Sequence, residues 1–135
     1  MRIVIDMQGA QTESRFRGIG RYTLSLTQEI VRHRGEHEVI LVLNGLFAET
    51  IEPIRAAFHG LLPQESIIVW HVPGPVHENN TENKERRRVA ELLREAFLAS
   101  LKPDIIPLWQ DSWHYLIINQ LGGSGVDSAS LFRRT

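Results

Sequence analysis

The sequence predicts an α/β fold, because short runs of β-branched residues alternate with stretches of helical periodicity. The runs RIVID, VILVL, SIIVW and a last one at Asp104–Ile106 have the composition of buried strands. Between them, apolar residues recur every three or four positions, which is typical of helices that cover a sheet. Strands joined in this way by helices run parallel and are covered on both faces. The expected architecture is therefore Rossmann-like.

The first strand and the first helix are predicted within the first 35 residues. The run Arg2–Asp6 starts close to the N-terminus, as a central strand of a buried sheet would. A helix follows, and Gly35 is a natural end for it. The apolar stripe of this helix consists of Ile19, Tyr22, Leu26 and Ile30.

Two further strand and helix units are predicted from the same signals. The second strand is Val39–Leu43, followed by a helix at Ala48–Phe58 with Pro53 near its first turn. The third strand is Ser66–Trp70, after which HVPGPVHENN reads as a loop. The apolar positions of the third helix are Val89, Leu92, Leu93, Ala96, Phe97 and Leu101. The predicted order of elements is therefore β-α-β-α-β-α-β.

The chain changes in character after Ile106. We assign residues 1–106 to a Rossmann-like domain and residues 107–135 to a divergent tail, in which only residues 115–118 have the composition of a strand. A doubly wound domain would normally continue with a further helix and strand. We therefore expect a truncated or frame-shifted reading frame, and the encoding DNA read in the other two frames beyond codon 106 would test this.

Composition and charge narrow the class of protein. The 135 residues are 42% hydrophobic and 23% charged, as in a globular domain. The net charge of −1 shows no overall excess of basic residues that would favour binding to nucleic acid. There is no cysteine, and no apolar run has the roughly 20 residues of a membrane span. We expect a cytoplasmic protein without a nucleic-acid partner.

The junction between the first strand and the first helix is the strongest candidate site. Gly18 and Gly20 precede the helix, and Arg15, Arg17 and Arg21 place three cations nearby. Glycines at a helix start let the backbone N–H groups approach a phosphate closely. An ordinary turn with a solvated arginine rim is an equally good interpretation. The dinucleotide fingerprint GxGxxG is absent, because its third position holds Thr23.

The amino-acid sequence of this junction resembles that of a known family. MRIVIDMQ followed by RGIGRYTLSLTQEI, then HEVILVLN and KPDII, is similar to the amino-terminal domain of retaining family-four glycosyltransferases of the GT-B fold. That group includes mannosyltransferases of bacterial surface polysaccharide assembly. The resemblance covers Met1 to about Ile106. It implies one half of a GT-B fold, in which this half receives the acceptor.

The resemblance also implies a donor site and a reaction. Gly18 and Gly20, and less directly Arg17 and Arg21, would face the diphosphate of a nucleotide-sugar donor. The full enzyme would transfer a hexose such as mannose to a glycan or lipid-linked acceptor, with no metal or other cofactor. The 135 residues lack a second domain for the donor, so we expect no turnover from them alone. The alternative is a free-standing module that binds a phosphorylated ligand or a protein without catalysis.

Asp6 and two histidines are secondary candidates. Asp6 ends the first strand, where it could contact a ligand or cap the local backbone. His71 and His77 flank the proline-rich loop after the third strand, where a sugar acceptor would bind, although solvation of the loop is the favoured explanation for them. No acidic partner lies at a ligand spacing, so we expect no zinc site.

The run KERRR is the densest group of basic residues. Arg87 and Arg88 are spaced to pair with Glu91, which favours a salt-bridged, solvated helix face. The alternative is peripheral contact with anionic lipids through Lys84, Arg87 and Arg88, which would suit an enzyme with a lipid-linked acceptor.

Overall fold

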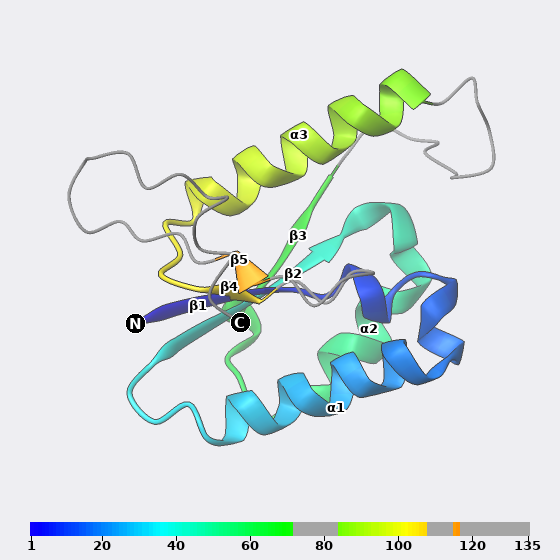
Figure 1. Cartoon of the computed structure of the whole chain (residues 1–135). Coiled ribbons are helices and arrows are strands. Elements are labelled where there is room, and N and C mark those ends of the chain that lie inside the picture. The colour runs from blue at the N-terminus through cyan, green and yellow to red at the C-terminus, as the bar shows by residue number, and fades with distance from the viewer. Residues whose placement is uncertain (72–83, 108–114, 117–135) are drawn as a thin grey trace.

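The computed structural model describes residues 1–71, 84–107 and 115–116 (Figure 1). Its main sheet has three parallel strands in the order β1-β2-β3, and the register pairs Ile5 with Leu41 and Leu41 with Ile67. The strands are β1 (Arg2–Asp6), β2 (Glu38–Asn44) and β3 (Ile67–Trp70). The sheet is therefore built from the first three predicted strands.

The chain returns to the other side of β1 at residue 105. Ile3 and Ile105 form a parallel bridge, and the Val4 N–H donates to the Ile105 carbonyl oxygen at 3.0 Å. The spatial order is thus β3, β2, β1 and residue 105, which is the order of the first half of a Rossmann sheet. The predicted α/β, Rossmann-like class is confirmed.

The fourth predicted strand differs from the prediction in its length and in its pairing. β4 (Ile106–Pro107) pairs antiparallel with β5 (Tyr115–Leu116), which covers two of the four residues predicted as a strand in the tail. Because β5 is antiparallel, it does not continue the parallel sheet. The division of the chain at residue 106 stays a prediction.

Helices cover both faces of the sheet. They are α1 (Gly18–Arg32), α2 (Ala48–Ala57) and α3 (Lys84–Ser100). Figure 1 shows α1 and α2 below the sheet and α3 above it. None of the described helices combines the length and apolarity that a membrane span requires.

Side chains of β2 alternate between two apolar cores. Leu41 and Leu43 are fully buried among residues of α1 and α2, whereas Val42 is buried on the side of α3. On the α3 side the rings of Trp70 and Phe97 stack with centroids 6.1 Å apart. A strand buried on both faces explains why VILVL is apolar without alternation.

The predicted apolar stripe of α1 is only partly buried. Ile19 and Tyr22 are each 55% exposed, whereas Ile30 is partly buried and packs against the core. The buried residues are instead Gly20, Thr23, Thr27 and Val31. Small side chains let the helix lie close to the sheet, and the Thr23 hydroxyl donates to the Ile19 carbonyl oxygen at 2.9 Å, so its burial leaves no unpaired donor.

The apolar positions predicted for the third helix divide between the core and the surface. Phe97 and Leu101 pack against the core, and Ala90 and Leu98 are buried with them. Three others are exposed, namely Val89 (49%), Leu92 (57%) and Leu93 (45%). The helix therefore has two apolar stripes, of which the sheet covers one.

Candidate functional site

The candidate site lies where the parallel strands end and α1 and α2 begin. After β1 the chain makes two short 3₁₀ helices, Gln8–Ala10 and Glu13–Phe16, before α1 starts at Gly18. After β2, α2 starts at Ala48, so the first turns of both helices lie at the same edge of the sheet. Ligands of open α/β sheets bind at this edge.

The start of α1 has unpaired backbone donors. Arg17 is the N-cap residue with extended backbone (φ −106°, ψ 174°), and no side chain caps the helix. The first helical bond is from the Arg21 N–H to the Arg17 carbonyl oxygen at 3.3 Å. Within the described residues, no protein acceptor is found for the N–H groups of positions 18 to 20, which lie at the positive end of the helix dipole.

The two predicted glycines differ in environment. Gly18 is exposed, and a Cβ atom placed on it would meet no heavy atom within 4 Å. Gly20 is buried against the first 3₁₀ turns and lines a pocket. The folded chain itself thus does not require glycine at position 18, whereas an approaching anion would benefit from the missing side chain.

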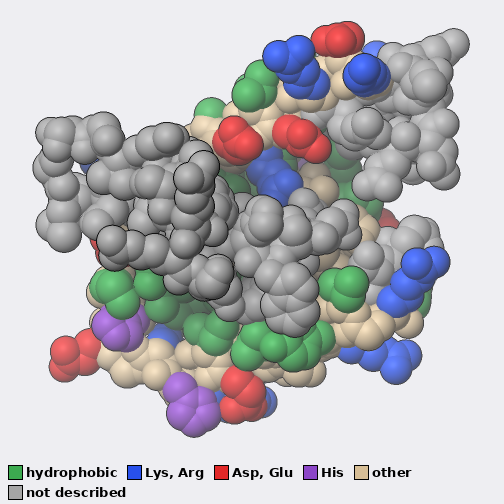
Figure 2. Space-filling view, in the orientation of Figure 1, with side chains coloured by type: hydrophobic (Ala, Val, Ile, Leu, Met, Phe, Trp, Pro, Cys, Tyr) green, Lys and Arg blue, Asp and Glu red, His purple; other side chains and the backbone are tan. Residues whose placement is uncertain are grey.

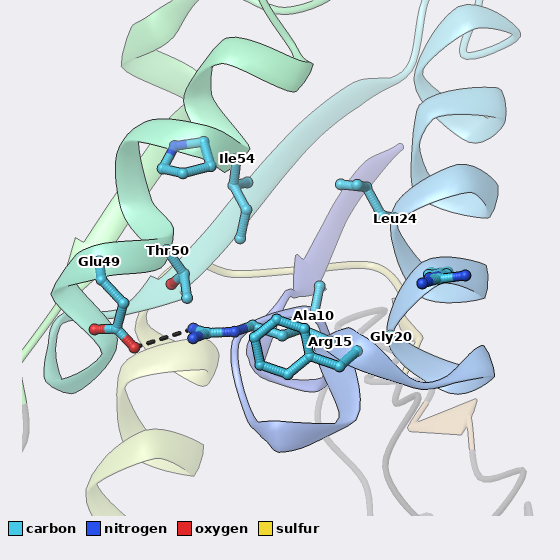
Figure 3. Close-up of a pocket in the computed structure, with 10 residues that line it drawn as sticks. Ala10, Arg15, Gly20, Leu24, Glu49, Thr50 and Ile54 are labelled. Carbon is cyan, nitrogen blue, oxygen red and sulfur yellow. Dashed lines mark hydrogen bonds and ion pairs between the residues drawn. The ribbon is translucent and has the colours of Figure 1, made fainter.

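A pocket of about 330 Å³ lies between the first turns of α1 and α2 (Figure 3). Its lining includes Gly20 and Arg21 from α1 and Glu49 and Ile54 from α2. The wall is mostly apolar, and charged groups lie at its rim. The structure therefore brings two of the four predicted donor-loop residues to one concave surface.

The three arginines of the loop have different roles. Arg15 is engaged, because its Nη1 lies 3.0 Å from Glu49 Oε1 and its guanidinium lies 4.6 Å from the centre of the Phe16 ring. Figure 3 shows this Arg15–Glu49 contact across the pocket. Arg17 and Arg21 form no ion pair with any described residue. Those two arginines are the charges left for an anion.

Glu49 is held in its ionised form at the rim of the pocket. A hydrogen bond from its own backbone N–H lowers the pKa of its carboxyl group, and the hydrogen bond from Arg15 lowers this pKa further. The charge of Arg15 is thereby compensated at neutral pH. The positive character of the site consequently comes from Arg17, Arg21 and the helix start.

Asp6 is a structural residue in this fold. It is 5% exposed, its Oδ1 accepts the Gln8 N–H at 2.9 Å, and its Oδ2 lies 2.5 Å from Arg94 Nε of α3. The alternative in which Asp6 caps the local backbone is therefore observed. The carboxylate also ties α3 to the end of β1.

His71 lies at the end of β3, at the same edge of the sheet. A Cβ atom on Gly45 would stand 2.4 Å from His71 Nδ1, so the imidazole rests directly over the Gly45 backbone. His71 is exposed, which leaves it accessible to a ligand at this edge. His77 lies outside the described residues.

Sequence reasoning missed the polar cluster beneath the site. Gln11, which is 1% exposed, accepts the Asn44 N–H at 2.8 Å and donates through Nε2 to the Asn44 carbonyl oxygen and to Thr50 Oγ1, each at 3.0 Å. The Asn44 side chain accepts the Leu46 N–H, and the Thr50 hydroxyl donates to the Phe47 carbonyl oxygen. This cluster fixes the β1–α1 connection to the start of α2. Three polar residues at element ends were its only sequence signal.

Three side chains of the basic run at the start of α3 are described, and all three are exposed. Lys84, Arg86 and Arg88 form no ion pair with a described residue, so the predicted Arg88–Glu91 pair is not found. The exposed acidic residues of the same helix are Glu85, Glu91 and Glu95. Leaving aside Arg87, whose side chain is not described, these charges balance.

No metal site emerges from the described part of the chain, in which no three His, Cys, Asp or Glu side chains are grouped closely enough to hold an ion. The chemistry available at this edge is hydrogen bonding and charge. Unpaired backbone N–H groups and two arginines next to a concave surface form a site suited to a phosphorylated ligand.

The described residues thus form a Rossmann-like half domain with an anion-compatible helix start. No protein-family model and no solved structure matches the chain. Among curated proteins, the chain is similar to serotype-specific mannosyltransferase WbdA of Escherichia coli, with 35% identity over 107 residues. That match covers 78% of this chain and 13% of the relative.

Two further Escherichia coli proteins described as serotype-specific mannosyltransferase WbdA match less closely. They are 28% and 27% identical over 82 residues, which is 60% of this chain and 10% of each relative. The predicted resemblance to mannosyltransferases is therefore confirmed. The chain spans 13% or less of the length of these relatives, so it corresponds to one part of such a protein.

Proposed function

We propose that this chain is the acceptor-side, Rossmann-like half of a GT-B glycosyltransferase of polysaccharide assembly. In the full enzyme it would act in the transfer of a hexose, mannose being the foremost candidate, from a nucleotide sugar to a glycan or lipid-linked acceptor. The single observation that carries the proposal is the uncapped start of α1, where Gly18 is open to solvent beside Arg17 and Arg21. The similarity to mannosyltransferases supports the choice of reaction.

The role of this junction would be electrostatic. When a sugar leaves its nucleotide, negative charge develops on the diphosphate, and N–H groups fixed in advance stabilise it without reorganisation. The N–H groups of positions 18 to 20 are fixed by the first turn of α1, and the Gln11 cluster holds the loop before them. Arg17 and Arg21 would add charge-assisted hydrogen bonds to the phosphate oxygens.

The donor-binding role can be tested on the 135-residue chain by NMR titration with a panel of nucleotide sugars. We expect shifts centred on the amides of residues 17–21. Gly18→Val should abolish these shifts without unfolding the chain, because a side chain at this position meets no protein atom in the fold. Arg17→Ala and Arg21→Ala should weaken binding, whereas Arg32→Ala, at the other end of α1, should not.

Unchanged binding by Gly18→Val would overturn the assignment of this loop. Sugar transfer by the same samples separates the two function classes. We expect no turnover, because a donor-holding second domain lies outside these residues, and robust turnover would refute that expectation. Binding of simple phosphorylated ligands with no preference for nucleotide sugars would favour the free-standing binding module.

A further inference from the structure

The dipeptide Asn44–Gly45, at the end of β2, is chemically labile in a flexible chain. The backbone nitrogen that follows an asparagine can attack Cγ of its side chain. This attack is fastest when the next residue is glycine, because no Cβ atom obstructs the approach. Of the asparagines in this sequence, Asn44 alone precedes a glycine. The lability of this dipeptide in the folded chain therefore depends on how the fold holds it.

The packing at the end of β2 gives both residues a structural role. The Asn44 side chain accepts the Leu46 N–H at 3.0 Å and so caps the short 3₁₀ helix at residues 45–47. A Cβ atom at position 45 would stand 2.4 Å from His71 Nδ1 and 3.2 Å from the Trp70 carbonyl oxygen. A residue with a side chain would therefore displace its neighbours. The fold thus favours the labile dipeptide at this position.

The folded chain holds Asn44 away from the reactive geometry. A five-membered succinimide ring closes only when the bond to the Gly45 nitrogen nearly eclipses the Cα–Cβ bond of Asn44. Asn44 is extended (φ −89°, ψ 121°), which turns this nitrogen away from the side chain. Its backbone N–H and carbonyl oxygen are both bonded to the Gln11 side chain, and the residue is 3% exposed. Gln11 must therefore release Asn44 before the ring can close.

We propose that Asn44 is a deamidation site that the native fold keeps closed, and that opening of the cluster of Gln11, Asn44 and Thr50 controls its modification. In the open state the Gly45 nitrogen bonds to Cγ of Asn44, and the side-chain nitrogen leaves as ammonia with the proton of the Gly45 N–H. Water then opens the succinimide at either carbonyl carbon, which gives aspartate or isoaspartate. The inference is independent of the glycosyltransferase assignment.

Both products change the end of β2. Isoaspartate adds a methylene group to the backbone between the N–H and the carbonyl group of residue 44, so Gln11 can no longer bind both in the present geometry. Either product also adds a negative charge at the edge of the sheet where α1 begins. Figure 2 shows Lys and Arg side chains along this right-hand edge of the molecule. Deamidation would therefore lower the positive potential there.

Peptide mapping of the 135-residue chain by mass spectrometry, after incubation at mildly alkaline pH, tests the proposal. In urea, Asn44 should deamidate faster than the other asparagines. In the folded chain its rate should be at least about tenfold lower than in urea, because opening must precede the reaction. Equal rates in the folded and unfolded chain, or an Asn44 that is stable in urea, would overturn the proposal.

Gln11→Met tests whether the cluster controls the reaction. The change removes both bonds to the Asn44 backbone and should raise the rate in the folded chain at least about tenfold. Gln28→Met is the matched control, because Gln28 bonds the Ala57 carbonyl oxygen, and its rate should stay closer to that of the wild type. Equal rates in Gln11→Met and the wild type, or equal acceleration by both changes, would overturn control by the cluster.

Thr50→Val serves as a milder second variant if circular dichroism shows that Gln11→Met does not fold. This change removes the bond from Gln11 to Thr50 but leaves the two bonds to the Asn44 backbone in place. It should therefore raise the rate by a smaller factor than the transfer of the wild type into urea. A rate in folded Thr50→Val equal to that of the wild type would also count against control by the cluster.

Discussion

Asp6 and Arg94 form a buried ion pair that joins the end of β1 to α3 across 88 residues of sequence. The side chain of Asp6 is 4% exposed and that of Arg94 is 15% exposed. The pair holds α3 in place at mid-length, next to the edge of the sheet that carries the candidate site.

Asp6→Asn should destabilise the fold by about 3 kcal/mol, because it removes the carboxylate of a mostly buried ion pair. The amide oxygen can still accept the Gln8 N–H, so the change isolates the charge. Urea unfolding followed by circular dichroism measures the loss. The control is Glu29→Gln in the exposed Arg32–Glu29 pair, where we expect less than about 1 kcal/mol. Equal effects of the two changes would contradict the assignment.

Gln11→Met should cost about 3 kcal/mol of unfolding free energy. The substitution keeps the length of the side chain but removes three hydrogen bonds and leaves the Asn44 N–H and carbonyl groups buried without a partner. Gln28→Met is the matched control, since Gln28 makes one partly buried bond to the Ala57 carbonyl oxygen, and we expect about 1 kcal/mol there. The measurement is chemical denaturation of both variants, and a smaller effect at Gln11 would count against the cluster.

Thr27→Val should stabilise the protein by about 1 kcal/mol. The Thr27 side chain is fully buried, and its hydroxyl has no hydrogen-bond partner where the chain is described, so a methyl group removes an uncompensated polar atom without changing volume. Thr23→Val is the control on the same helix face. The Thr23 hydroxyl is hydrogen-bonded, so we do not expect its loss to stabilise the protein. The unfolding temperature of Thr27→Val should therefore be higher than that of the wild type. The unfolding temperature of Thr23→Val should be equal to that of the wild type or lower.

The carboxyl group of Glu49 should titrate with a pKa below its ordinary value of 4.5. A folded-state pKa below the unfolded value means that the contribution to stability is present above pH 4.5 and is lost as the pH falls through the folded pKa. Carbon-detected NMR titration should show the midpoint rising in Arg15→Ala but staying below 4.5, because the backbone hydrogen bond remains. Arg32→Ala should leave the midpoint unchanged. A midpoint insensitive to Arg15 would contradict the contact across the pocket.

The alternation of strands and helices could be predicted because it depends on composition that is local in sequence. The runs RIVID and VILVL are buried on both faces, and few other elements in a globular protein need so continuous an apolar character. The faces of the helices were harder to predict. Periodicity finds apolar stripes, but in α1 the sheet contacts Gly20, Thr23 and Thr27, whose small size matters more than their hydropathy.

The site was predictable only in part, for a similar reason. Glycines before an amphipathic helix indicate an open helix start, and Gly18 and Gly20 lie there. The engagement of Arg15 by Glu49 and the hydrogen bonds of Gln11 to Asn44 join residues more than 30 positions apart. No local sequence pattern indicates such contacts. Glutamine is also normally a surface residue, so its burial is not expected from the sequence.

The position of β1 between β2 and residue 105 has a consequence for biosynthesis. At about 5 to 20 residues per second, the ribosome completes residue 105 roughly 5 to 20 s after β1, and until then one edge of β1 has no neighbour. An unpaired edge of this kind can recruit a strand from another nascent chain. Translation speed through the segment between β3 and residue 105 should therefore influence how much of the newly made protein reaches its native sheet.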